Sequence, residues 1–355
     1  MNLPVNTILL AVLSILASGC TDSFDGPVEM IPIIPTGGQA RFMMGSSVEE
    51  LAVQPGQPGD PHYRTADEQL HEVRLTVPYE IGKYEITNAE YVLVMNKAIS
   101  TGQARIADGD LSDIPGNRLL GIAHLVEDKY LGVQHGIEIA NGRLRSKSGQ
   151  EHDPVHAVTW FGALLFCNVL SETLGLEPVY EPGTWTWNQS RNGYRLPTEA
   201  EWAYAARKNE RWTYAWGDSI GPEYCCADPF NEATGWEYIN TPVGFFDGSK
   251  RDGFQTRRNA SPFGVFDMTG NVWEWCWDWY SGIYFESGPV TDPLGPEYGD
   301  LRPPFDTLYP TRVWRGCGWL GTPAYLRVAK RWSAAPQTAI NEVGFRVART
   351  LGPQK

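Results

Sequence analysis

The segment from Gly270 to Trp279 reads GNVWEWCWDW and places two carboxylates among four indole rings. A purely hydrophobic core has no need of Glu274 and Asp278. A carboxylate buried among such rings must be ion-paired, hydrogen-bonded or bound to a metal. Each indole N–H also needs a partner when the ring is packed inside. This segment is therefore the first candidate for an ionic or metal-binding site.

The cysteines are the other reactive groups. If Cys20 is modified, as argued below, five remain, and an odd number leaves at least one thiol unpaired or paired between chains. Adjacent cysteines such as Cys225 and Cys226 can bond to each other only with strain. The sequence has neither a CxxC pair nor a Cys/His cluster with zinc spacing. We therefore expect structural or incidental thiols at the five positions Cys167, Cys225, Cys226, Cys276 and Cys317.

Other residues with catalytic potential give no readable site. No HExxH zinc motif occurs in the sequence. His152 and His156 are four residues apart, but the intervening Pro154 prevents them from sharing one helix face. They are either solvated or hydrogen-bonded histidines, or a loop metal site. Glu199 and Glu201 belong to the start of a helix, so they are not proposed as an acid–base pair.

Length and charge restrict the class of protein. The chain has 355 residues and a net charge of −13, and an acidic chain repels phosphate backbones, so no nucleic-acid partner is expected. Gly and Pro are abundant, at 37 and 26 residues, which favours a loop-rich fold over a helix bundle. No break in composition appears after residue 36. We therefore predict one domain over 36–352, with an insertion at about 96–150.

The N-terminus resembles an export signal. Ile8–Leu16 is an apolar run too short to span a bilayer but suited to a signal-peptide core. Small residues and then Cys20 follow, which resembles a bacterial lipoprotein signal with Cys20 as the lipidated residue. This predicts a signal peptide over 1–19, a tether over 20–35 and a membrane anchor in the cell envelope, at the outer membrane where the cell has one. The alternative is an ordinary cleaved signal with an incidental cysteine.

Local patterns predict several elements. Alternating apolar residues indicate a strand within 71–77, and Val155–Trp160 has the length of another strand. Helices are predicted near Ala89, capped by Thr87 or Asn88, and over Phe161–Leu174 before Gly175. The sharpest signal is the capping box of Thr198 and Glu201, which predicts a helix over 198–208.

Eight stretches together carry a family resemblance. The chain resembles the formylglycine-generating enzyme, or sulfatase-modifying factor, family in order from about residue 36 to 350. This implies an α+β, C-type-lectin-like fold with little regular secondary structure. The matching stretches are FMMGS (42–46), DE followed by HEVRLTVPYEIGKYEITNAEY (67–91), PVHAVTWFGALLFCN (154–168), GYRLPTEAEWAYAAR (193–207), WGD (216–218), FGVFDMTGNVWEWCWDWY (263–280), RVWRGCGW (312–319) and GFRVAR (344–349).

The resemblance does not extend to the copper site. The aerobic enzymes of this family oxidise a sulfatase cysteine to formylglycine with copper held by two cysteines five residues apart. Those positions are Leu326 and Arg331 here, and neither side chain can ligate copper. Cys317 lies nine residues before Leu326, where the family usually has glycine. We therefore expect no bound copper and no competent catalytic residue at these positions.

The resemblance does extend to a calcium loop. Carried over to this chain, the ligands are Asp267, the backbone carbonyls of Gly270 and Val272, and Glu274, and hard oxygen ligands on a turn suit Ca²⁺. The alternative is that Asp267 and Glu274 only cap turns among the tryptophans. We also expect an architectural role for the following residues: Arg195, Glu201, Trp202, Asn271, Trp273, Glu274, Arg315, Gly344 and Arg346.

Three functions remain open on this basis. The first is a non-catalytic envelope lipoprotein with a binding, structural or accessory maturation role and a protein or glycan partner. The second is the oxidation of a sulfatase cysteine to formylglycine, which the missing cysteine pair opposes. The third is an unidentified related oxidation, although the histidines do not form the iron-binding cluster of the sulfoxide synthases.

Overall fold

The computed structural model contains three α-helices among many short strands. Within the described residues, the helices are α2 (Asn88–Ser100), α3 (Trp160–Thr173) and α4 (Glu199–Arg207), with the 3-10 helices η1 (Thr36–Gly38) and η2 (Ala66–Glu68). The mixed α+β class predicted from the sequence is thereby confirmed. The structure describes residues 28–46, 66–122, 135–227, 240–251, 253–284, 288–301 and 308–352.

Side-chain caps fix where the helices begin. The Thr198 hydroxyl accepts the Glu201 amide at 3.2 Å, and the Glu201 carboxylate accepts the Thr198 amide at 2.9 Å. Thr87 forms the same capping box with Glu90, and Thr159 caps α3. The predicted helices at 198–208 and 161–174 are therefore confirmed within a residue or two, and the one near Ala89 extends to Ser100.

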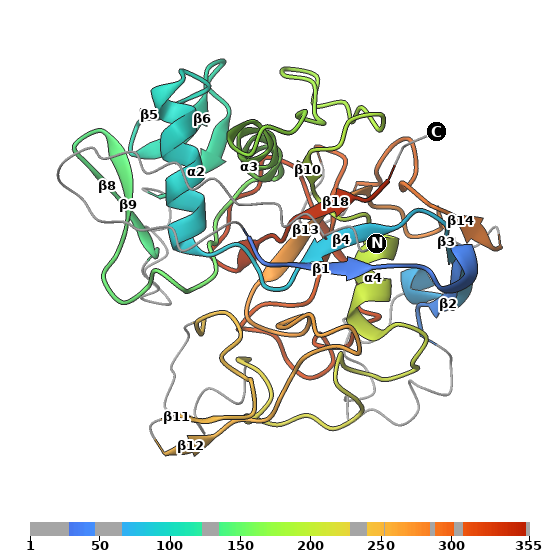
Figure 1. Cartoon of the computed structure of the whole chain (residues 1–355). Helices are drawn as coiled ribbons and strands as arrows, with labels where there is room; N and C mark the ends of the chain where they lie inside the picture. The colour runs from blue at the N-terminus through green and yellow to red at the C-terminus, as the bar shows by residue number, and fades with distance from the viewer. Residues whose placement is uncertain are drawn as a thin grey trace, which may run out of the picture.

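Two four-stranded sheets form the centre of the molecule. The first has the order β1 (Met30–Ile33), β4 (Tyr79–Gly82), β18 (Ala348–Thr350) and β10 (Tyr194–Arg195), so it joins both ends of the described chain (Figure 1). The second has the order β16 (Trp332–Ala334), β15 (Arg312–Arg315), β13 (Trp273–Trp279) and β17 (Val343–Gly344), with β17 parallel to β13.

Smaller sheets surround these two. One contains β14 (Val290–Thr291), β3 (His71–Leu75) and β2 (Ala40–Met44), and alternate side chains of β2 and β3 are buried, as the sequence predicted for residues 71–77. Another is the hairpin of β11 (Lys250–Arg251) and β12 (Phe254–Gln255).

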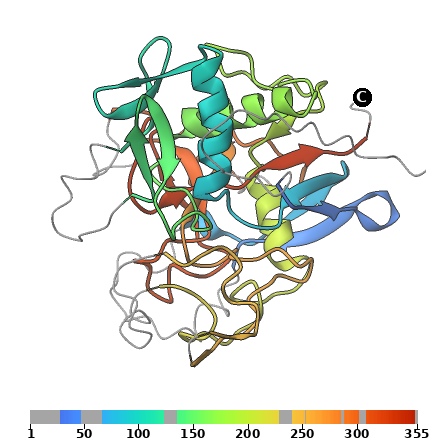
Figure 2. The same ribbon diagram turned by 60° about the vertical axis from the view of Figure 1, so that its left-hand side comes forward.

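The predicted insertion folds as two small sheets beside α2. They are β5 (Ala104–Ala107), β6 (Asp110–Asp113) and β7 (Arg118–Leu120), and the hairpin of β8 (Ile137–Ala140) and β9 (Arg143–Ser146). In Figure 2 both lie on one side of the molecule, together with α2.

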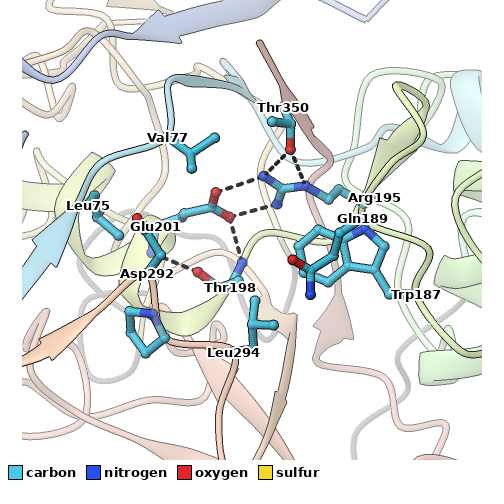
Figure 3. Close-up of a pocket in the computed structure, with 11 residues that line it drawn as sticks. Leu75, Val77, Trp187, Gln189, Arg195, Thr198, Glu201, Asp292, Leu294 and Thr350 are labelled. Carbon is cyan, nitrogen blue, oxygen red and sulfur yellow. Dashed lines mark hydrogen bonds and ion pairs between the residues drawn. The ribbon is translucent and has the colours of Figure 1, made fainter. Parts of the chain in front are cut away.

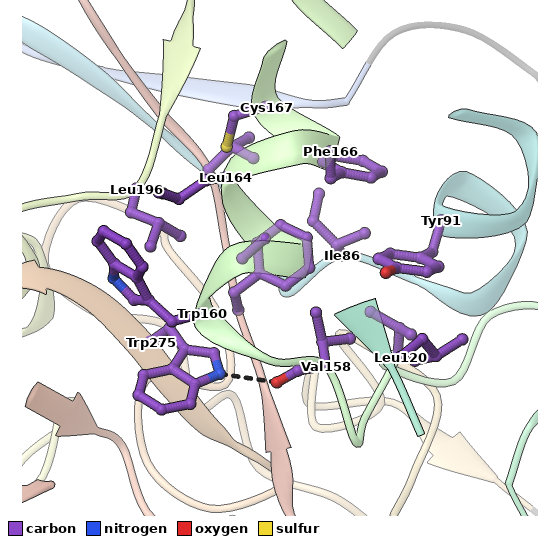
Figure 4. Close-up of a cluster of buried hydrophobic side chains, with 14 of the residues drawn as sticks. Ile86, Tyr91, Leu120, Val158, Trp160, Leu164, Phe166, Cys167, Leu196 and Trp275 are labelled. Carbon is purple, nitrogen blue, oxygen red and sulfur yellow. Dashed lines mark hydrogen bonds between the residues drawn. The ribbon is translucent and has the colours of Figure 1, made fainter. Parts of the chain in front are cut away.

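The core is aromatic, and two of its indole N–H groups, those of Trp160 and Trp275, donate to backbone carbonyls. Figure 4 shows Trp160 and Trp275 packed against side chains of α3 and neighbouring loops. Trp275 Nε1 donates to the Val158 carbonyl at 2.8 Å, and Trp160 Nε1 donates to the Cys276 carbonyl at 3.0 Å. The segment rich in tryptophan is therefore buried, as expected, and it holds the second sheet against α3.

Two expectations about local structure were wrong. Val155–Trp160 is not a strand, because Val158 makes only an isolated bridge to Leu120 and Trp160 already begins α3. The predicted tether extends too far, since Met30–Ile33 pairs with β4 as a strand. Both errors concern short apolar segments, whose state is decided by the partner that packs against them.

The N-terminal predictions lie outside the described residues. The signal peptide over 1–19 and the lipidation site Cys20 both precede residue 28, where the description begins. In the part of the chain that is described, none of the helices has both the length and the apolar character needed to cross a bilayer.

Candidate functional site

The two family copper positions lie in the turns that follow β15. Leu326 is fully buried and packs in the main hydrophobic core. Arg331 is 4% exposed. A cuprous ion needs soft ligands such as thiolates, and these two side chains offer an alkyl group and a guanidinium instead. The positions predicted to be incompetent for copper are thus occupied by buried structural side chains.

Arg331 is held by a bidentate ion pair with Glu199 at the start of α4. Arg331 Nε donates to Glu199 Oε1 at 2.7 Å, and Nη2 donates to Oε2 at 2.9 Å. Arg331 Nη1 also donates to the carbonyls of Asp67 and Ser281, at 3.2 and 2.9 Å. Parallel guanidinium–carboxylate bonds are strong and fix orientation, so this side chain is locked in place.

A second arginine completes the surroundings of Glu199. Arg315 Nη1 lies 3.3 Å from Glu199 Oε1, and Arg315 Nη2 donates to the Val328 carbonyl at 2.6 Å. Burial alone would raise the pKa of Glu199, but the charges of Arg331 and Arg315 outweigh it and lower the pKa below its usual value. Glu199 is therefore an ionised partner of two arginines rather than only a residue of the first helical turn.

The same turns supply a second buried ion pair. Arg327 Nη1 and Nη2 donate to the Glu68 carboxylate at 2.7 and 3.1 Å, and Lys330 Nζ lies 3.3 Å from Glu68 Oε1. Burial raises the pKa of Glu68, and the two cations more than reverse that effect. The segment at the family copper positions thus uses its cations to neutralise Glu68 and Glu199.

One carboxyl group beside this network stays protonated near neutral pH. Burial and the charge of Glu199 raise the pKa of Asp278 to about 8. Asp278 Oδ2 accepts the Glu199 amide at 2.7 Å. Asp278, one of the two carboxylates first singled out, is therefore a hydrogen-bonding group at the N-terminus of α4, where anions and polar acceptors are favoured.

The five cysteines within the described residues are all buried, and none of them forms a disulfide bond there. Burial raises the pKa of each thiol, most strongly for Cys225, Cys276 and Cys317. A thiol of this kind is a poor nucleophile and a poor metal ligand, because the thiolate is the reactive form. This arrangement fits the structural thiols that the sequence predicted. Cys317 is a buried thiol with a raised pKa like the others, and so it does not resemble a replacement for the missing copper-binding cysteines.

The implied calcium loop has its side chains already engaged. Glu274 accepts Arg346 Nε and Nη2 at 2.6 and 2.7 Å, and Trp202 Nε1 at 2.8 Å. Asp267 accepts the Gly244 amide at 2.6 Å and Asn259 Nδ2 at 2.9 Å. Both Glu274 oxygens accept from Arg346, so this carboxylate already has a cationic partner inside the protein.

Sequence analysis missed Glu85, a third carboxylate at this loop. It accepts Asn271 Nδ2 at 2.7 Å and the Val272 amide at 3.2 Å. Burial raises the pKa of Glu85 well above its usual value, and the charges of Asp267 and Glu274 add to the effect. No local signal marks Glu85, which lies in an ordinary stretch after β4.

The carboxylates at this loop are therefore hydrogen-bonded or ion-paired to other groups of the protein. Among the residues that the structure describes, no group of three or more His, Cys, Asp or Glu side chains is arranged to hold a metal ion. Calcium binding through Asp267, Gly270, Val272 and Glu274 stays a prediction.

The two closely spaced histidines have different surroundings. His152 is exposed, whereas His156 is buried and its ring centroid lies 4.7 Å from that of His135. His135 Nδ1 accepts the Ile137 amide at 2.9 Å, and His135 Nε2 lies 2.9 Å from the His156 carbonyl. His156 is therefore buried rather than solvated, but only its backbone carbonyl takes part in these bonds, and its ring Nδ1 has no hydrogen-bond partner within the described residues.

Arg195 and Glu201 have the architectural role expected of them. Arg195 Nη1 and Nη2 donate to the Glu201 carboxylate at 2.6 and 2.7 Å, beside the Thr198 cap (Figure 3). The cavity at this pair has a volume of about 70 Å³. That space suits a few water molecules rather than an organic substrate.

Known proteins resemble this chain over most of its length. The family model described as "Sulfatase-modifying factor enzyme 1-like domain" matches residues 38–351. The formylglycine-generating enzyme of Streptomyces coelicolor is 29% identical over 335 residues, covering 88% of this chain and 89% of that one. The chaperone protein LppX of Paenibacillus barcinonensis is 32% identical over 225 residues, and the match covers 54% of this chain and 72% of LppX.

A solved structure resembles this one in fold. PvdO from Pseudomonas aeruginosa superposes with a TM-score of 0.57 at 23% identity, covering 93% of this chain and 97% of the other. The C-type-lectin-like α+β fold expected from the sequence motifs is therefore confirmed. Together with the match over residues 38–351, this shows that the chain belongs to the formylglycine-generating enzyme, or sulfatase-modifying factor, family.

Proposed function

We propose that this protein is an envelope lipoprotein whose domain has a non-catalytic binding, structural or accessory maturation role. The observation that carries this proposal is the bidentate pair of Arg331 with Glu199 at one of the two copper positions. Leu326 at the other position is fully buried in the core. Because two thiolates are the chemistry of the copper enzymes, their replacement by packed structural side chains removes the oxidase function.

The relatives support an accessory role. LppX bears the name of a chaperone protein, which supports a role in assisting another protein. The proposed partner is a protein or a glycan outside the cytoplasm. Lipidation of Cys20 would tether the domain to the membrane, at the outer membrane where the cell has one, and would place it next to exported clients.

The alternative is the oxidation of a sulfatase cysteine, or an unidentified related oxidation. Its support is the similarity to the Streptomyces coelicolor enzyme over nearly the full length of both chains. The five described thiols oppose it, since all are buried and their pKa values are raised. An oxidase of this family would need one of them to become a thiolate.

A peptide assay separates these functions. The protein is loaded with copper under reducing conditions and incubated in air with a peptide that carries the sulfatase signature Cys-x-Pro-x-Arg. We expect mass spectrometry to show no formylglycine, while a formylglycine-generating enzyme run in parallel converts the peptide. Conversion by this protein would overturn the proposal, and Cys317→Ser would then test whether that thiol is the ligand.

The anchor is tested in a bacterial host that labels lipoproteins with a radioactive fatty acid. We expect label on the wild-type protein and none on Cys20→Ser. Equal recovery of both proteins in the soluble periplasmic fraction would support the ordinary cleaved signal instead.

A further inference from the structure

A pocket of about 570 Å³ opens between the insertion and the loop that follows α3. This volume is within the range of small-molecule sites, and the pocket shares no lining residue with the family copper positions. Its lining comes from three segments: Gly102, Gln103 and the turn after β6; α3; and the loop over residues 178–191.

Its walls are mainly apolar and aromatic. Of the lining residues, Leu165 and Tyr180 are buried and Ile114 is 53% exposed. Trp185 is half-buried, and its ring packs against Phe161 with centroids 6.1 Å apart. The pocket therefore offers a flat aromatic surface and a hydrophobic floor to a ligand with an apolar body.

Trp185 holds its position at a conformational cost. Its φ is 57°, in the left-handed region that bulky side chains rarely adopt. Hydrogen bonds fix this conformation: the Trp185 amide donates to the Glu181 carbonyl at 2.8 Å, and the Glu181 amide donates to the Thr186 carbonyl at 2.9 Å. Strained residues of this kind gather at ligand clamps and functional sites.

The charges at the pocket select for a cation. Glu172 is an exposed residue in the last turn of α3, which contains no basic residue, and its carboxylate accepts Gln103 Nε2 at 3.1 and 3.3 Å. A helix C-terminus also attracts positive charge. The cation of the lining, Arg191, is engaged by Glu181 at 2.8 Å and by the Pro178 carbonyl at 2.9 Å.

We propose that this pocket binds a small organic cation, an amine joined to an apolar or aromatic body. The body lies against Trp185 and Leu165, and the ammonium group faces the carboxylate of Glu172. An ammonium beside an indole also gains from the negative face of the ring. This inference stands apart from the proposed function, since a non-catalytic domain is expected with or without this ligand.

Matched probes test the charge preference. The full chain carrying Cys20→Ser is titrated with 2-phenylethylamine, with 2-phenylethanol as the neutral analogue and with 3-phenylpropanoate as the anion, using ligand-observed NMR. We expect the amine to bind most tightly. Glu172→Gln is expected to weaken its binding about three- to fivefold, as for an exposed ion pair, without changing the affinity for the alcohol.

Two further variants locate the site. Trp185→Ala is expected to weaken the amine and the alcohol alike by about tenfold or more, because both lose the aromatic surface. Glu177→Gln, an exposed carboxylate in the same loop that does not line the pocket, is expected to leave binding unchanged. Equal affinity for all three probes, no effect of Glu172→Gln, or preference for the alcohol or the anion over the amine would overturn the proposal.

Discussion

Arg331 and Glu199 are 132 residues apart in the sequence and form a two-point ion pair in the interior. Arg331 occupies the position at which the family's copper enzymes have their second copper-binding cysteine. It links the turns after β15 to the N-terminus of α4, so a position used elsewhere for chemistry serves here to join two parts of the domain.

Removal of Arg331 should destabilise the fold. Arg331→Met leaves Glu199 buried with only Arg315 beside it, and loss of one partner of a buried pair costs about 3 kcal/mol or more. The free energy of unfolding from urea titration measures the effect. Arg257→Met is the matched control, because its pair with Glu223 is 3.7 Å long and Arg257 is 65% exposed, which predicts a change within about 0.5 kcal/mol. Equal stability of the two variants would contradict the structural role of Arg331.

The buried histidine pair should make stability depend on pH below neutrality. Burial lowers the pKa of His135 to about 4 and that of His156 further from its usual value, with Lys147 adding to both shifts. An unfolded histidine titrates near about 6.5, so between about pH 4 and 6.5 the unfolded chain binds more protons. The contribution of the two neutral histidines to the free energy of unfolding is then fully present above about pH 6.5. It falls as the pH drops, by about 1.4 kcal/mol per pH unit for each histidine.

A variant isolates this histidine effect from the titration of buried carboxyl groups. His135→Asn keeps an acceptor for the Ile137 amide but does not titrate. Urea unfolding between pH 4.5 and 7.5 measures how the free energy of unfolding changes with pH. The slope for the variant should correspond to about one proton fewer than the slope for the wild type. Identical slopes for the two proteins would argue against a neutral His135 in the native state.

The native thiols should resist modification. Burial raises the pKa of all five described cysteines, and the disulfide reagent DTNB reacts only with accessible thiolates. We expect Cys20→Ser protein to show almost no reaction when folded and five reactive thiols in guanidinium chloride. A fast-reacting thiol in the native protein would instead favour the oxidase alternative.

Calcium addition tests the metal prediction derived from the family loop. A ligand that binds only the native state at 100 times its dissociation constant adds about 2.7 kcal/mol of stability. If the loop binds calcium, Tm in millimolar calcium should exceed Tm in EGTA, and Asp267→Asn should reduce that difference. Identical Tm values in both buffers would mean that Glu274 serves its internal partners, Arg346 and Trp202, and no calcium ion.

The sequence determined the features that depend on neighbours along the chain. The Thr198–Glu201 capping box links residues three apart, so its pattern could be recognised without the fold. The absence of thiols at Leu326 and Arg331 was likewise visible from the aligned motifs. The predicted strand at 155–160 failed because a short apolar segment takes the structure that its packing partners impose.

Only the tertiary structure decided what each carboxylate does. Glu199 and Glu201 are two residues apart at the same helix start, yet one pairs with Arg331 and the other caps the helix and pairs with Arg195. Glu274 and Arg346, 72 residues apart, pair in the same way. The sequence around each of these carboxylates does not tell them apart. They differ in the arginine that tertiary packing places next to each one in the water-excluded interior. The sequence supplied the charges, and the fold assigned their partners.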